Sequence, residues 1–97
     1  MFEASIAFQV LPEGENVKEK IRIIDKVIAM VQKSGVSYEV GAMETTIEGD
    51  LETLFRIIKK AQYLCVKEGA RSVFTNVKIL YNPKGVMTIR EKVDKYR

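Results

Sequence analysis

The 97-residue sequence contains no histidine, no tryptophan and only one cysteine, Cys65. A lone cysteine without histidine cannot complete a zinc site within one chain, form a CxxC redox pair or act in a Ser-His or Cys-His catalytic unit. These absences exclude most familiar hydrolases and metalloenzymes. We therefore expect no metal site within one chain.

Long hydrophobic runs are also missing from the sequence. Polar or charged residues interrupt each apolar run after a few residues, whereas a membrane span needs about 20 consecutive apolar residues. Residues 1–5 lack the basic stretch followed by an apolar stretch that marks a secretory signal. We expect a single domain over residues 1–97 that is cytoplasmic and has no membrane partner.

The sequence does contain regular alternation of apolar residues with other residues, which is typical of half-buried β-strands. This alternation predicts strands over residues 3–11, 36–41, 45–48 and 71–81. The β-branched residues Thr45, Thr46 and Ile47 favour a strand, and residues 42–44 are expected to connect it to the preceding strand as a hairpin.

Two helices are predicted between the strands, over residues 17–34 and 51–68, and each is followed by a glycine. Asn16 and Asp50 are suited to cap their N-termini. Thr88, with Glu three residues later, predicts a short terminal helix. The apolar stripe expected on the first helix is Val17, Ile21, Ile24, Ile28 and Val31. The contacts expected from the terminal helix are Ile89, Val93 and Tyr96.

The element order βαββαβ plus a short C-terminal helix defines an α+β, ferredoxin-like sandwich, in which a four-stranded antiparallel sheet carries two helices on one face. The other face is then uncovered. Residues expected toward the helices are Ile6, Phe8, Val10, Tyr38, Val40, Ile47, Val73, Val77 and Ile79. Residues expected on the open face are Ser5, Ala7, Gln9, Ser37, Glu39, Thr46, Glu48, Phe74, Asn76 and Lys78.

This open face has two possible roles. It is either an ordinary solvated surface, as antiparallel sheets often have, or an interface between copies of the chain. Ala7, Phe74 and Leu80 favour the interface, because they would otherwise be exposed near a last strand whose free edge invites pairing. We expect a homo-oligomer.

Two carboxylates on this face, Glu39 and Glu48, need a cation, hydrogen-bond donors or protonation if an interface buries them. Lys78 is placed to supply part of this compensation. A cross-strand ion pair explains Glu39 as well as ligand contact does, whereas for Glu48 we favour ligand contact.

The hydroxyl groups of Thr45 and Thr46 are the second candidate feature. They can donate and accept hydrogen bonds and would orient a small ligand that carries nitrogen atoms, with Tyr38 or Met43 as an apolar wall. The alternative is structural, because threonine is common in strands by propensity alone.

From residue 35 to residue 49 the sequence reads GVSYEVGAMETTIEG. The order of Gly, Tyr, Met, Thr and Ile-Glu-Gly in this segment resembles the signature of the small thiamine-binding, YkoF-like family. The likeness extends over nearly the whole chain. Further matches lie at residues 10–12, 59–61 and 87–93.

The resemblance implies a ferredoxin-like subunit that forms a dimer or tetramer and binds thiamine, or its hydroxymethylpyrimidine part, as a ligand. It also implies that the protein is not an enzyme and uses no cofactor. It points to Thr45, Thr46 and Glu48 as ligand-binding residues, with Tyr38 and Met43 as neighbours. A carboxylate such as Glu48 suits an aminopyrimidine through charge-assisted hydrogen bonds, and the positive thiazolium ring suits acidic and aromatic surroundings.

Other functions are less favoured by the residues. RNA binding on an open ferredoxin-like sheet needs aromatic platforms and basic surroundings, but only Phe74 qualifies and the net charge of +3 is spread along the chain. A phosphate cradle of the acylphosphatase type is disfavoured by Glu13 and Glu15, which would repel an anion before the first helix. A regulatory module of the amino-acid-sensing type, which would use the same fold, is the main alternative.

Overall fold

The computed structural model describes residues 2–97 and has the predicted order of elements. The elements are β1 (Ala4–Pro12), α1 (Val17–Lys33), β2 (Ser37–Val40), β3 (Thr45–Gly49), α2 (Leu51–Lys67), β4 (Val73–Tyr81), α3 (Ile89–Val93) and the 3-10 helix η1 (Asp94–Tyr96). The strand and long-helix boundaries lie within two residues of those predicted.

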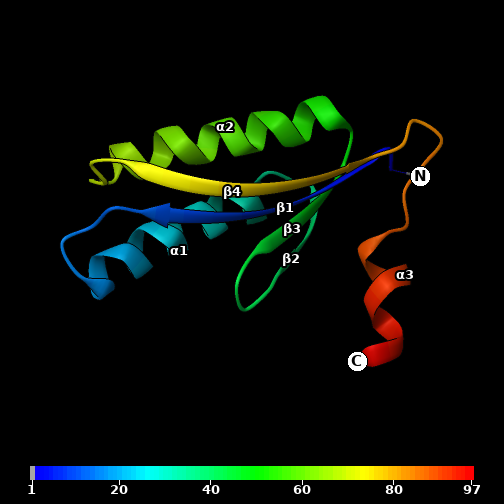
Figure 1. Ribbon diagram of the computed structural model, residues 1–97, viewed down its shortest axis with the longest axis horizontal. Coiled ribbons are helices and arrows are strands. Elements are labelled where there is room, and N and C mark those ends of the chain that lie inside the picture. The colour runs from blue at the N-terminus through cyan, green and yellow to red at the C-terminus, as the bar shows by residue number, and fades with distance from the viewer. Residues whose placement is uncertain (1) are drawn as a thin grey trace.

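The strands form one antiparallel sheet in the order β2-β3-β1-β4. Ile6 of β1 lies opposite Ile47 of β3 on one side and Ile79 of β4 on the other. Figure 1 shows α1 and α2 running along one side of this sheet, with α3 standing apart near the C-terminus. This arrangement is the predicted α+β, ferredoxin-like sandwich.

Local sequence signals set the ends of the two long helices. The side chain of Asn16 accepts a hydrogen bond from the backbone N–H of Glu19 at 2.9 Å, and Asp50 does the same for Thr53 at 3.0 Å. The hydrogen bond from Thr53 lowers the pKa of the Asp50 carboxyl. Gly35 follows α1 with φ of 84°, a backbone conformation that favours glycine. These features confirm the predicted caps.

The core lies between the sheet and the two long helices. Its buried members include Ile6, Phe8, Val10, Ile23, Val27, Val31, Ile47, Leu54, Ile57, Ala61 and Cys65. The predicted stripe of α1 was wrong at Val17 and Ile21, which are 69% and 53% exposed. The face of α1 that meets the sheet is instead centred on Val27. Burial raises the pKa of the Cys65 thiol, which lies in this core.

The outer strands are less covered than predicted. On β2, Tyr38 and Val40 face the helix layer but remain 38% and 43% exposed. On β4, the exposed fractions of Val77 and Ile79 are 38% and 47%. The reason is that both long helices pack most closely over β1, so the side chains toward the two edges of the sheet stay partly in solvent.

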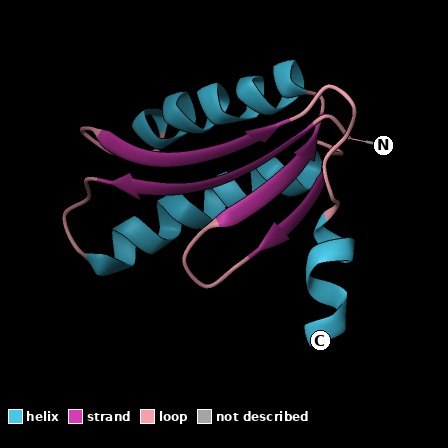
Figure 2. Cartoon of the chain, turned by 45° about the vertical axis from the view of Figure 1, so that its right-hand side comes forward, coloured by secondary structure: helices cyan, strands magenta, loops and turns pink. Residues whose placement is uncertain are grey.

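The terminal helix α3 covers only one end of the sheet face that the two long helices leave open. In Figure 2, α3 lies beside the end of β2, on the opposite side of the sheet from the long helices. Thr88 and Glu91 form the predicted capping box at its start. Tyr96 is 77% exposed and does not make the predicted contact with the body. No helix in residues 2–97 is long and apolar enough to cross a membrane.

Candidate functional site

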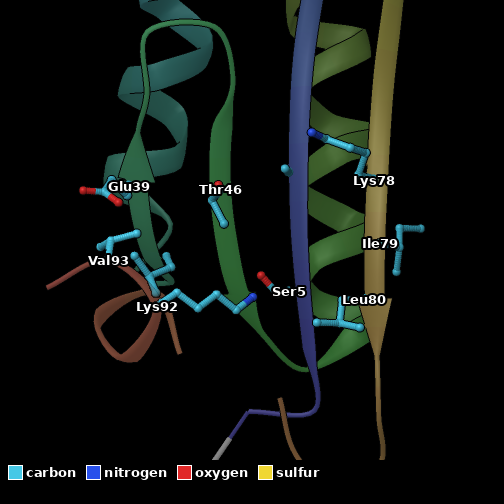
Figure 3. A pocket seen from close by; sticks show the side chains of 10 residues that line it. Ser5, Glu39, Thr46, Lys78, Ile79, Leu80, Lys92 and Val93 are labelled. Atoms are coloured by element: carbon cyan, nitrogen blue, oxygen red, sulfur yellow. The ribbon is translucent and has the colours of Figure 1, made fainter. Parts of the chain in front are cut away.

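A hollow of about 290 Å³ lies where the open face of the sheet meets α3. Its lining comprises Ser5, Ala7, Glu39, Thr46, Lys78, Ile79, Leu80, Ile89, Lys92 and Val93. The central strands provide the floor, β4 provides one side and α3 provides the other. Figure 3 shows the side chain of Lys92 reaching from α3 over the strands toward Ser5.

The hollow exists because a small residue occupies the centre of the sheet face. Ala7 of β1 lies directly between Thr46 of β3 and Lys78 of β4. A methyl group between two longer side chains leaves space above it, and alternation along β1 brings Ser5 to the same surface. The floor therefore combines hydroxyl groups with a small apolar patch.

Most charged groups around the hollow are already paired. Glu39 forms an ion pair with Arg97, and the ammonium group of Lys78 lies 2.8 Å from a carboxylate oxygen of Glu44. Lys92 makes no ion pair with any residue between 2 and 97. The lining thus offers hydroxyl groups and a partly buried carboxylate as acceptors, with one unpaired cation at its α3 side.

Glu48 lies beside the hollow, at the base of α3, and is only 4% exposed. One carboxylate oxygen accepts from the hydroxyl of Ser37 at 2.6 Å, and the other accepts from the backbone N–H of Ile89 at 2.7 Å. Because Ile89 is the first residue of α3, this second bond ties the helix to the sheet. Glu48 is therefore sheltered by its own chain and positions one wall of the hollow.

The structure does not bring the six predicted ligand residues into one pocket. Glu39, Thr46 and Glu48 lie on the open face, and only the first two line the hollow. Tyr38 lies on the helix side of β2 and lines a second cleft, of about 300 Å³, beside Glu48.

Thr45 and Met43 do not line the hollow. Thr45 is buried toward the helices, and Met43 is 77% exposed in the hairpin. Both line a separate groove of about 350 Å³ between α1 and the hairpin. Adjacent residues of a strand point to opposite faces, so Thr45 and Thr46 cannot share a pocket.

Several lining residues were not predicted as site residues. Ser5 and Ala7 were placed on the open face by alternation, and their small size in a central strand was the available signal. Ile89, Lys92 and Val93 gave no such signal. Their position depends on the contact between Ile89 and Glu48, which are 41 residues apart in the chain.

Fold and hollow together define a ferredoxin-like domain with a sheltered, partly polar hollow on the sheet face opposite its long helices. The sequence matches the family described as thiamine-binding protein over residues 6–97. The chain belongs to this family, which confirms the resemblance seen in residues 35–49.

Individual relatives agree with this assignment. The chain is 44% identical, over the full length of both proteins, to a UPF0045 protein of Clostridium perfringens. A Bacillus cereus structure, described as a domain of unknown function (DUF77), has a TM-score of 0.88 and 48% identity, covering 99% of this chain and 91% of that one. A Thermotoga maritima protein, provisionally assigned to thiamine biosynthesis or salvage, has a TM-score of 0.84 and 32% identity, covering 98% and 99%.

Proposed function

We propose that this protein binds thiamine, or the hydroxymethylpyrimidine part of thiamine, in the hollow between the open sheet face and α3, without catalysing a reaction. The observation that carries the proposal is the lining itself. The hydroxyls of Ser5 and Thr46 and the carboxylate of Glu39 surround a small apolar floor at Ala7. Membership of the thiamine-binding protein family supports the same ligand class.

The chemistry of an aminopyrimidine suits this lining. Its exocyclic amino group is a donor for Glu39 or Thr46, and its ring nitrogens are acceptors for hydroxyl groups. The flat ring can lie over Ala7 against the apolar side chains of Leu80 and Val93. In this arrangement Glu48 acts by holding α3 in place.

The size of the hollow favours the pyrimidine end of thiamine. Its volume of about 290 Å³ is at the lower end of the range of roughly 300–1,000 Å³ that is usual for ligand pockets. The ammonium group of Lys92 would also repel the positive thiazolium ring. We therefore expect the pyrimidine to occupy the hollow and the thiazolium to project from its mouth, away from Lys92.

Calorimetric titration with thiamine, hydroxymethylpyrimidine and oxythiamine tests this proposal. Oxythiamine replaces the amino group with an oxygen, so it loses the donor for Glu39 or Thr46 and should bind at least about tenfold more weakly, or about 1.4 kcal/mol. Thiamine at 100 times its Kd should raise the free energy of unfolding by about 2.7 kcal/mol. Neither heat nor thermal stabilisation at millimolar thiamine or pyrimidine would refute the proposal, and a response to amino acids alone would favour the amino-acid-sensing alternative.

We further propose that copies of the chain associate as a dimer or tetramer through β4 and the open face beside it. In the described part of the chain, β4 pairs with β1 and leaves its other edge free. The exposed fractions of Phe74, Leu80 and Tyr81 on this strand are 67%, 50% and 50%. Exposed aromatic and aliphatic side chains along a free strand edge are typical of association surfaces.

Charge placed on this strand should break the association. We expect Phe74→Glu to lower the mass measured by light scattering to that of a single chain, because a carboxylate in an apolar interface is costly to desolvate. Tyr63→Glu is the matched control, since Tyr63 is similarly exposed, at 65%, but lies on α2. A wild-type protein that is a single chain at high concentration would contradict the proposed association.

A further inference from the structure

A groove of about 700 Å³ runs between α1 and α2 on the solvent side of the helix layer. It is remote from the hollow, which lies on the other face of the sheet. The thiamine proposal makes no use of this surface.

The rims of the groove are strongly basic. Lys26 and Lys33 of α1 and Arg56, Lys59 and Lys60 of α2 line it, and all five are exposed. The lining contains no acidic residue, and none of the five cations forms an ion pair within residues 2–97. Unpaired like charges on both rims create a positive potential between the helices.

The charge distribution of the whole chain shows how unusual this surface is. The sequence has 16 basic and 13 acidic residues. When the five groove cations are set aside, 11 basic and 13 acidic residues remain, so the rest of the chain is net negative. The groove therefore accounts for more than the entire net positive charge of the protein.

Between the basic rims the groove has an apolar floor. Ala29 and Met30 contribute from α1, and Ile57 and Leu64 contribute from α2. Met30 and Leu64 also pack against the core, which holds this floor in place. A rigid apolar floor flanked by cations matches the groove type that receives an amphipathic helix.

We propose that this groove docks an acidic amphipathic helix of a partner protein. The apolar side chains of that helix would rest on Met30 and Leu64, and its Asp or Glu side chains would face Lys26 and Lys60 on opposite rims. Charge complementarity selects this occupant. A second copy of the chain that docked through the same groove would bring its own five cations against these five and be repelled.

The floor also distinguishes a peptide helix from a nucleic acid. Phosphate backbones are held by cations and need no apolar floor. Single-stranded RNA is usually held by several stacking aromatic side chains, and Tyr63 is the only aromatic residue in the lining.

Fluorescence anisotropy with a labelled 16-residue peptide tests the proposal. The peptide carries Leu at helical positions i, i+3, i+4 and i+7 with Glu on both sides, and a scrambled peptide of the same composition lacks the apolar stripe. We expect the patterned peptide to bind at least about tenfold more tightly than the scrambled one, with affinity that falls as salt rises.

Two double variants locate the binding. Lys26→Glu with Lys60→Glu reverses one cation on each rim and should weaken binding of the patterned peptide at least about tenfold. Lys18→Glu with Lys20→Glu makes the same change in net charge at exposed positions outside the groove and should leave binding nearly unchanged. Circular dichroism checks that both variants remain folded.

Three outcomes would overturn the proposal. Equal loss of binding in both double variants would mean that only net charge matters. Equal affinity for the patterned and scrambled peptides would remove any role for the apolar floor. The third outcome is that single-stranded RNA binds more tightly than the patterned peptide and that the Lys26→Glu, Lys60→Glu variant loses this RNA binding. The groove would then be a nucleic-acid site instead.

Discussion

Thiamine binding should be lost when Ala7 is replaced by phenylalanine. Ala7 forms the floor of the hollow between Thr46 and Lys78, and the space above it exists because its side chain is a single methyl group. A phenyl ring at this position would occupy the volume that we assign to the pyrimidine. We expect the affinity for thiamine to fall at least about tenfold, which corresponds to about 1.4 kcal/mol.

Gln9→Phe provides the control for this experiment. Gln9 lies two residues further along the same face of β1 and outside the lining of the hollow. The variant introduces the same ring on the same strand, with loss of an exposed hydrogen bond from Asn76. It should keep the wild-type affinity in calorimetry. Unchanged thiamine binding in Ala7→Phe would show that the ligand occupies a different place.

Replacing Glu48 with alanine should release α3 from the sheet. The variant loses the acceptor for the Ser37 hydroxyl and for the backbone N–H of Ile89. Hydrogen bonds to a charged group contribute about 1.5–3 kcal/mol each. Both donors are only partly buried, so movement of α3 into solvent lets water replace the lost acceptor. Amide hydrogen exchange should accelerate in residues 89–96 while β1 and β3 stay protected.

Loss of the α3 wall should also weaken ligand binding. We expect thiamine affinity in Glu48→Ala to fall at least about tenfold, because Ile89 and Val93 no longer close the hollow. Ser37→Ala separates the two hydrogen bonds, since it removes the Ser37 donor and keeps the bond to Ile89. It should retain both slow exchange in α3 and most of the affinity. If Glu48→Ala shows fast amide exchange in α3 but binds thiamine as tightly as the wild type, then α3 has no role in ligand binding.

The fold was predictable because local signals and periodicity agreed. Asn16, Asp50 and Thr88 each begin a helix where the spacing predicted. The phase of α1 was harder to predict, because apolar residues occur on more than one side of the helix. Val17 and Ile21 extend one apolar row, and Val27 lies on another. Only packing against the sheet selects the row that becomes the core.

The candidate site was predictable only in part. Period-two alternation places Glu39, Thr46 and Glu48 on one face, and the structure confirms that placement. It also places Thr45 on the opposite face, although both the shared hydroxyl chemistry and the family resemblance grouped Thr45 with Thr46. Glu48 anchors α3 through Ile89, which lies 41 positions further along the chain. A contact over such a separation cannot be inferred from sequence spacing.

The attachment of α3 has a kinetic consequence. One wall of the hollow is a helix of five residues that is tied to the sheet through Glu48. Detachment of so short a segment exposes little core, so it needs less free energy than unfolding of the domain. The dwell time of a bound molecule would then follow the opening rate of residues 89–97, and the four strands would remain intact during each exchange.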